Sequence, residues 1–114
     1  DDLAGMSLVG FSPGMSLRVH IDRLLLKCRV VPNFAASAQT IESICALVAA
    51  GCGGAIIHPY ATHVTRMHGL STSVIEPTEV LDLTAVLPRV PRRSAFADEF
   101  VRSVEHIYAA GPEP

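Results

Sequence analysis

The sequence predicts an α/β fold in which a Rossmann-like sheet, parallel or mixed, is flanked by helices. Three apolar segments have strand character, namely Met6–Phe11, Arg29–Ala36 and Gly53–Ile57. Two helical patterns, Met15–Cys28 and Ile41–Ala50, separate them through short connections. Strands and helices that alternate in this way usually form a parallel sheet with right-handed crossovers. Apolar residues make up 49% of the 114 positions and aromatic residues only 5%, which indicates an aliphatic core.

The first helical segment carries apolar residues on two faces. One stripe has the spacing of a core-facing surface and comprises Leu17, Ile21, Leu24, Leu25 and Cys28. Met15, Val19 and Leu26 lie together on nearly the opposite side. The sheet can bury only one stripe, so we expect the second to form a protein–protein or interdomain contact.

The second strand and the second helix have recognisable ends. Pro32 lies near the start of the strand and favours an edge position, because proline cannot donate to a sheet ladder. The loop Ser37–Thr40 ends in Thr40, a good N-cap residue. The helix that follows is nearly all apolar, so it should be heavily buried, and Gly51 is expected to end it.

The remaining chain predicts a short helix and two further strand candidates. The helix is expected at Pro59–Arg66, and the strands at Thr72–Ile75 and Val80–Leu87. Ser94 is placed to cap a final helix. One face of that helix is apolar and comprises Phe96, Phe100, Val104, Ile107 and Tyr108.

Charge and cysteine usage narrow the function classes. The formal net charge of −2 gives no general attraction to nucleic acid or to anionic membranes. No apolar stretch is long enough to span a bilayer, and no export signal is evident. Cys28, Cys45 and Cys52 all lie within apolar patterns, and their odd number favours reduced thiols in a cytoplasmic protein.

Gly10–Gly14 matches the G-x-S-x-G nucleophile elbow of serine hydrolases, and Asp82 and His106 follow in the hydrolase order. The oxyanion hole of that elbow uses the backbone N–H of the residue after the serine, which here is Pro13 and has none. Loss of one such donor typically lowers the rate by about 10²–10³. We therefore expect a non-enzymatic strand–turn–helix joint that presents a hydroxyl and helix-start amides to a ligand.

Ligands of open parallel sheets bind beyond the carboxyl ends of the strands. Three loops are expected at that edge, which we call the rim: Ser12–Met15, Ser37–Thr40 and His58–Ala61. Two of them lead into helices whose first amides carry partial positive charge, which suits a small carboxylate or phosphate. Neutral hydrogen-bonding groups at the rim are Ser12, Ser16, Ser37, Gln39 and Thr40. Ser12 and Thr40 could alternatively serve only as helix caps.

Other motifs predict no metal and no cofactor. His58, His63 and His68 are spaced by five residues, whereas one helical face would require three or four. The glycines of Gly51–Gly54 follow a helix and precede a strand, which is the wrong polarity for a phosphate loop. The arginines within Arg89–Arg93 have the character of a solvated surface cluster.

Three stretches recur together in one known family. Asp2–Gly5 precedes a strand, Ser12–Gly14 precedes the first helix, and Leu47–Gly53 reads Leu-Val-Ala-Ala-Gly-Cys-Gly before an apolar strand. In this order they resemble the effector-binding domain of LysR-type transcriptional regulators, over nearly the whole chain. The resemblance implies the second lobe of a two-lobed domain similar to type 2 periplasmic binding proteins.

The same resemblance implies a ligand and a way of acting. In such regulators a small molecule, often a carboxylate metabolite, binds between the lobes and controls a DNA-binding winged helix-turn-helix that lies outside this sequence. By position, the second lobe's effector contacts would be Ser12, Pro13, Gly14, Ser37, Gln39 and Thr40, with His58 as a further candidate. His58 stands where the family usually has a proline, and Pro59 is displaced by one position.

The resemblance also implies a dimer and a domain arrangement. LysR-type effector domains pair antiparallel, which would place Met15, Val19 and Leu26 in a dimer interface. Residues 1–110 would form one lobe, with the helix at 94–110 normally packed on the first lobe and 111–114 as a tail. Without that lobe, the final helix is expected to fold back or to dock on a neighbouring chain. The alternative is a lobe of a solute-binding protein or of a related two-lobed enzyme.

Overall fold

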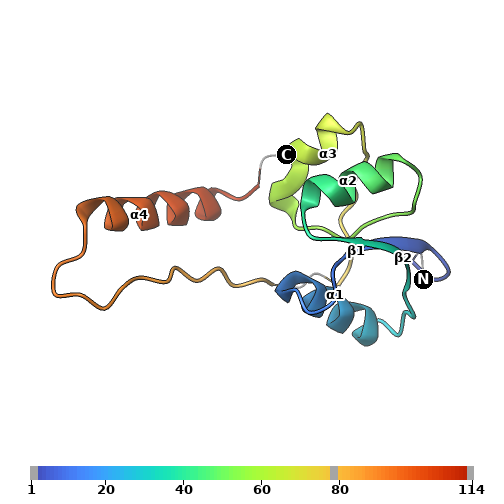
Figure 1. Cartoon of the computed structure of the whole chain (residues 1–114), viewed down its shortest axis with the longest axis horizontal. Helices are drawn as coiled ribbons and strands as arrows, with labels where there is room; N and C mark the ends of the chain where they lie inside the picture. Colours follow the sequence, from blue (N-terminus) through green and yellow to red (C-terminus); the bar gives the residue numbers. More distant parts are fainter. Residues whose placement is uncertain (1–2, 78–79, 113–114) are drawn as a thin grey trace. The chain divides into compact units, whose positions relative to one another are not determined.

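The computed structural model of the chain describes residues 3–77 and 80–112 (Figure 1). Contacts divide it into two compact units, Asp1–Glu79 and Val80–Pro114. The first unit contains β1 (Ser7–Phe11), α1 (Ser16–Lys27), β2 (Asn33–Ala38), α2 (Ile41–Ala49), the 3₁₀ turn η1 (Pro59–Ala61) and α3 (Thr62–Met67). The second unit contains α4 (Ala95–Ala110).

The sheet of the first unit is a parallel pair. β1 runs beside β2 from Ser7 opposite Asn33 to Phe11 opposite Ala38, with one irregularity between Leu8 and Val9. The strand–helix–strand order and its parallel pairing confirm the predicted α/β class. β2 covers Asn33–Ala38 rather than the predicted 29–36: it begins only after Pro32, because proline cannot donate to the ladder, and it extends through Ser37.

The predicted third strand is reduced to a single bridge. Gly54 pairs with Leu8 in parallel, and two hydrogen bonds hold it: Val9 N–H donates to the Gly54 carbonyl at 2.7 Å and Gly54 N–H donates to the Ser7 carbonyl at 2.9 Å. Gly53 has a φ of 144°, and a Cβ built there would overlap the Ser7 carbonyl oxygen. Glycine is therefore required where this segment approaches β1.

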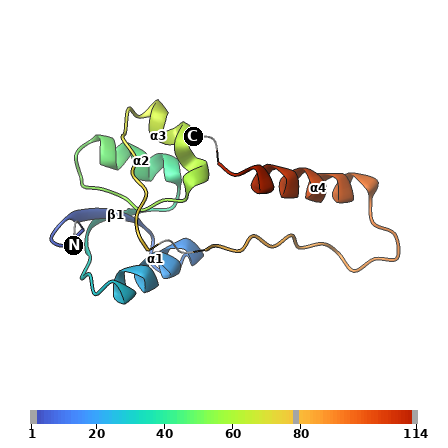
Figure 2. The ribbon, with the colours of Figure 1, turned by 180° about the vertical axis from the view of Figure 1, so that it is seen from behind.

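Helices cover both faces of the pair, with α1 on one side and α2 with α3 on the other (Figures 1 and 2). The buried cluster comprises Leu8, Val9, Phe11, Ile21, Leu25 and Ile44. α1 contributes Ile21, Leu24 and Leu25 as predicted. Cys28 is exposed, contrary to the predicted stripe, because α1 ends at Lys27 and Cys28 is its C-cap.

The helix ends follow the sequence signals. The Thr40 side chain accepts a hydrogen bond from the Ser43 N–H at 3.2 Å, and the Ser94 side chain accepts one from the Phe96 N–H at 3.2 Å. Gly51, with a φ of 86°, follows the C-cap of α2. The short helix expected at Pro59–Arg66 is present as η1 followed by α3.

The two later strand predictions are wrong for the residues that the structure describes. Thr72–Ile75 and the segment 80–94 contain no strand within that part of the chain. Alternation of apolar and polar residues does not by itself form a strand, because a strand needs a neighbouring strand to pair with, and no described strand pairs with these segments. α4 has no buried residue, and Phe96 of its apolar face is 87% exposed. Among the described helices, none is both long and apolar enough to cross a membrane.

Candidate functional site

The rim begins where β1 turns into α1. Ser12 follows the last β1 residue, and its N–H donates to the Ala38 carbonyl at 3.0 Å. The Ser12 carbonyl accepts from the Met15 N–H at 3.2 Å, which closes a tight turn around Pro13. Gly14 has a φ of 88°, a conformation that favours glycine. The turn therefore holds Ser12 against the ends of both strands.

The two helices that begin at the rim differ in their capping. Met15 is the N-cap of α1 and its side chain makes no capping hydrogen bond. The first N–H groups of a helix have no partner within the helix, so α1 presents amides at Ser16 and the next residues. α2 differs because the Thr40 hydroxyl oxygen accepts a hydrogen bond from the Ser43 N–H. The protein itself therefore supplies a partner for one of the first N–H groups of α2.

An arginine that the sequence analysis did not single out secures the turn. The Arg18 Nη1 donates to the Phe11 carbonyl at 2.7 Å, and its Nε contacts Asp22 Oδ1 at 2.9 Å. Its guanidinium carbon lies 3.6 Å from the centre of the Phe34 ring, a cation–π distance, and its side chain is only 12% exposed. The side chain thus joins the start of α1 to both strands.

Gly10, the first glycine of the G-x-S-x-G pattern, has a packing role in this cluster. A Cβ at Gly10 would lie 2.6 Å from Cε1 of Phe34 and 3.3 Å from Nη1 of Arg18. Only a residue without a side chain therefore leaves room for the ring and the guanidinium. The contact of Gly10 with the Phe34 ring joins two different strands, so no local sequence signal indicates it.

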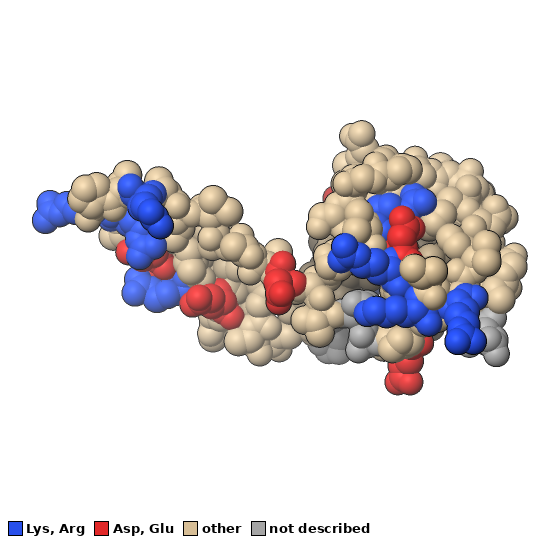
Figure 3. Space-filling model, turned by 90° about the horizontal axis from the view of Figure 1, so that it is seen from below, with Lys and Arg blue, Asp and Glu red and all other residues tan. Residues whose placement is uncertain are grey.

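Basic side chains gather on the face that carries α1 (Figure 3). Arg23 and Lys27 of α1 and Arg29 shortly after its end are exposed, as is Asp22 of the same helix. Leu26, on the same helix, is 77% exposed. This face of α1 therefore combines positive charge with an exposed aliphatic side chain.

The remaining predicted rim residues lie at the end of β2 or, in the case of His58, after the segment that forms the bridge at Gly54. Ser37 is exposed within β2, and Gln39 and Thr40 are exposed between β2 and α2. His58 is half-buried directly after Ile57, and its carbonyl accepts from the Ala61 N–H at 3.2 Å. Burial lowers the pKa of His58 from its ordinary value of 6.5, because it disfavours the charged imidazolium.

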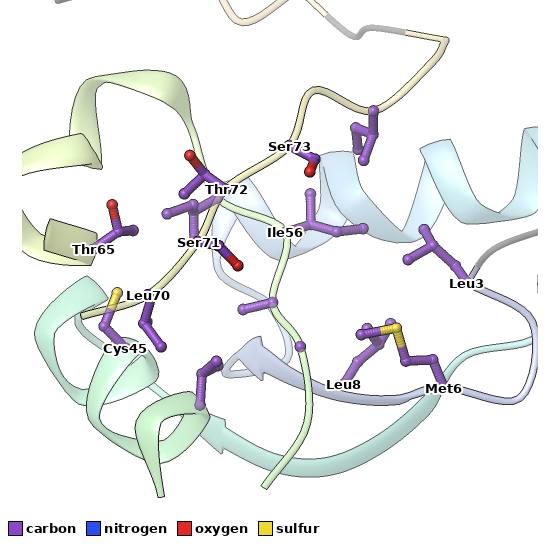
Figure 4. A pocket seen from close by; sticks show the side chains of 15 residues that line it. Leu3, Met6, Leu8, Cys45, Ile56, Thr65, Leu70, Ser71, Thr72 and Ser73 are labelled. Carbon is purple, nitrogen blue, oxygen red and sulfur yellow. The ribbon is translucent and has the colours of Figure 1, made fainter. Parts of the chain in front are cut away.

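Two adjoining cavities lie beside the segment that contains His58. The first, the hydroxyl compartment, has a volume of about 380 Å³ and is lined by Ile57, His58, Pro59, Thr62, Thr65, Thr72, Ser73, Val74 and Ile75. The second, the apolar compartment, has a volume of about 270 Å³ (Figure 4). The loops Ser12–Met15 and Ser37–Thr40 supply none of the residues that line these two cavities.

Comparison with known proteins gives one match. The family model of the LysR substrate binding domain matches residues 1–107. The chain belongs to the LysR substrate binding domain family. Domains of this family have the periplasmic-binding-protein-like fold and occur in transcription regulators that respond to small-molecule effectors. No curated protein and no solved structure matches the chain.

Further observations on this LysR substrate binding domain concern the residues of the metal and hydrolase alternatives. Among residues 3–77 and 80–112, no three His, Cys, Asp or Glu side chains form a group that could hold a metal ion. The Ser12 N–H is engaged by Ala38, and Pro13 supplies no donor beside it. Asp82 and His106, the other members of the hydrolase alternative, belong to the second unit.

Proposed function

We propose that the chain is the effector-sensing lobe of a cytoplasmic LysR-type transcription regulator and that it has no enzymatic activity. Its effector is a small anionic metabolite, of carboxylate type, bound at the rim. One observation supports this most strongly: α1 begins at the carboxyl end of β1 without a side-chain cap. An anion at that position would accept hydrogen bonds from amides that the protein leaves unused.

The proposed contacts come from both loops that precede helices. The turn of Ser12, Pro13 and Gly14 would hold the anion at the start of α1. Ser37, Gln39 and Thr40 would supply neutral hydrogen-bonding groups, with His58 at the edge of the site. DNA binding would belong to a winged helix-turn-helix elsewhere in the regulator.

Replacement of Ser16 by proline tests the amide contact without breaking the helix. Ser16 is the first residue of α1, a position that proline favours, and Met15 already has the extended conformation that precedes proline. Ser16→Pro removes one amide donor. Because a hydrogen bond to a charged group contributes about 1.5–3 kcal/mol, affinity should fall at least tenfold.

The assay is an NMR titration with benzoate, succinate and inorganic phosphate, followed by Ser16→Pro with the tightest of them. Ala95→Pro is the matched control, since Ala95 is the first residue of α4 and Ser94 is also extended. Equal affinity in Ser16→Pro and the unchanged protein would contradict binding at the start of α1. Absence of binding by all three anions would contradict an anionic effector for this lobe.

We also propose that α1 pairs with another protomer through Met15, Val19 and Leu26. Val19 is 37% and Leu26 77% exposed, whereas Met15 is half-buried and packs against the core cluster, contrary to the face predicted for it. Leu26→Glu would place a charge in that contact and should shift the chain to monomer in analytical ultracentrifugation. Val31→Glu is the control, because Val31 is equally apolar and 87% exposed outside α1. Unchanged mass for Leu26→Glu would exclude this helix from the interface.

The domain arrangement remains the one implied by the family. We propose that α4 covers its apolar face on the first lobe of the regulator or, without that lobe, on a neighbouring chain. The exposure of Phe96 and Phe100, 87% and 66%, supports a partner for that face.

A further inference from the structure

The hydroxyl compartment and the apolar compartment adjoin each other in the first unit, and together we call them the groove. Five residues line both of them, namely Ile57, Thr65, Thr72, Ser73 and Ile75. Figure 4 shows Leu3, Met6 and Leu8 at one end of the apolar compartment and Thr65 with Cys45 at the other. The hydroxyl compartment adds His58 and Thr62 to the shared residues. Ser and Thr side chains therefore line both compartments, whereas Leu3, Met6 and Leu8 gather at one end of the apolar compartment.

Of the hydroxyl side chains that line the groove, Thr65 belongs to the folded core, whereas Ser71, Thr72 and Ser73 are exposed. Thr65 is 3% exposed and is the buried polar residue of the described chain. Its hydroxyl donates to the Thr62 carbonyl at 2.8 Å, so its oxygen can still accept a hydrogen bond from a ligand. Thr65 lines both compartments, which places this acceptor where the two adjoin.

The groove has no charge to offer a ligand. None of the described residues that line either compartment is Lys, Arg, Asp or Glu. A carboxylate or an ammonium group would lose its hydration there without gaining a partner of opposite charge. An amide, ester or hydroxyl group could instead exchange hydrogen bonds with Thr and Ser hydroxyls.

The size also fits a small ligand. Ligand sites commonly have volumes of about 300–1,000 Å³, and the hydroxyl compartment reaches 380 Å³ before the apolar compartment extends it. The apolar compartment would bury a short aliphatic chain against Leu8, Val48 and Ile56. Each buried methylene should then raise the affinity by about fourfold.

We propose that this groove binds an uncharged amphipathic small molecule, with a short aliphatic chain in the apolar compartment and a hydrogen-bonding head group in the hydroxyl compartment. The groove shares His58 with the edge of the proposed effector site, but the loops Ser12–Met15 and Ser37–Thr40, where the anion would bind, do not line it. Variants at Ser16 and at Ala55 therefore probe the two sites separately.

A matched ligand pair tests the charge preference. Hexanamide and hexanoate differ mainly in charge, and hexanoate is ionised at pH 7.5. In NMR titrations of the full chain, hexanamide should shift the signals of Ile57, Thr65 and Ser73 and should bind at least tenfold more tightly than hexanoate. Butanamide should bind about fourfold more weakly for each methylene that it lacks. Hexanoate binding as tightly as hexanamide, or shifts confined to the rim, would overturn the proposal.

Two variants locate the ligand. Ala55→Leu adds bulk to the wall of the apolar compartment and should weaken hexanamide binding at least tenfold. Ala35→Leu, on an exposed position of β2, is the matched control and should leave binding unchanged. Thr72→Val keeps the shape of a side chain that lines both compartments but removes its hydroxyl, so it should weaken hexanamide more than hexane. If Ala55→Leu and Thr72→Val bind hexanamide as tightly as Ala35→Leu and the unchanged chain do, the assignment of the ligand to this groove is refuted.

Discussion

Gly53→Ala should damage the bridge that holds the His58 segment to the sheet. Gly53 has a φ of 144°, and the added methyl group would overlap the backbone carbonyl of Ser7. A residue with a side chain in such a conformation costs about 1–3 kcal/mol. Relief of the overlap would also stretch the two hydrogen bonds at Gly54, each worth about 0.5–1.5 kcal/mol net. The free energy of unfolding should therefore fall by about 2–6 kcal/mol.

Gly51→Ala is the control that measures the cost of a positive φ without any steric overlap. Gly51 also has a positive φ, 86°, but an added Cβ would meet no atom within 4 Å. Its cost should be limited to about 1–2 kcal/mol. Urea unfolding measures both changes, and hydrogen exchange of the Val9 and Gly54 amides reports the bridge itself. The reasoning is refuted if Gly53→Ala is no more destabilising than Gly51→Ala, or if both amides keep their protection.

Two further predictions concern titratable groups. Because burial lowers the pKa of His58, its contribution to stability is complete above the unfolded value of 6.5 and is lost as the pH falls below it. The urea midpoint should therefore drop less between pH 8 and pH 5.5 in His58→Gln than in the unchanged chain. An equal drop in both proteins would contradict this prediction. Burial and the nearby Glu42 charge raise the pKa of the Cys45 thiol, so iodoacetamide at pH 8 should label the exposed Cys28 first. If peptide mass spectrometry finds that Cys28 and Cys45 are labelled at equal rates, the burial of Cys45 is contradicted.

The first unit was largely predictable because its signals are local. Thr40 and Ser94 cap helices where their chemistry indicates, and α1 buries Ile21 and Leu25 through the 3.6-residue period. The parallel pairing of β1 with β2 follows from the helix between them. Such features depend on residues close together in the sequence, and a single sequence contains that information.

The features that the sequence did not reveal depend on contacts between distant residues. Gly10, Phe34 and Arg18 meet only after β1, α1 and β2 have packed, so the role of Arg18 has no local signature. The same limit applies to the groove, whose walls come from β1, α2, α3 and the segment after α3. At Val80–Leu87 the sequence instead predicts a feature that the described residues lack. Its alternation favours a strand, but a strand forms only with a pairing partner.

The capping of the two rim helices gives the strongest link between sequence and the proposed ligand. Both helices start at the carboxyl end of a strand, but α2 has Thr40 as its own acceptor whereas α1 has Met15, whose side chain cannot accept such a bond well. A missing cap typically lowers helix stability by about 1 kcal/mol. Arg18 and the tight turn at Ser12 offset this by tying the uncapped start to the strands. The start of α1 is thus held in place while its amides stay available, which is the arrangement that an anionic effector would require.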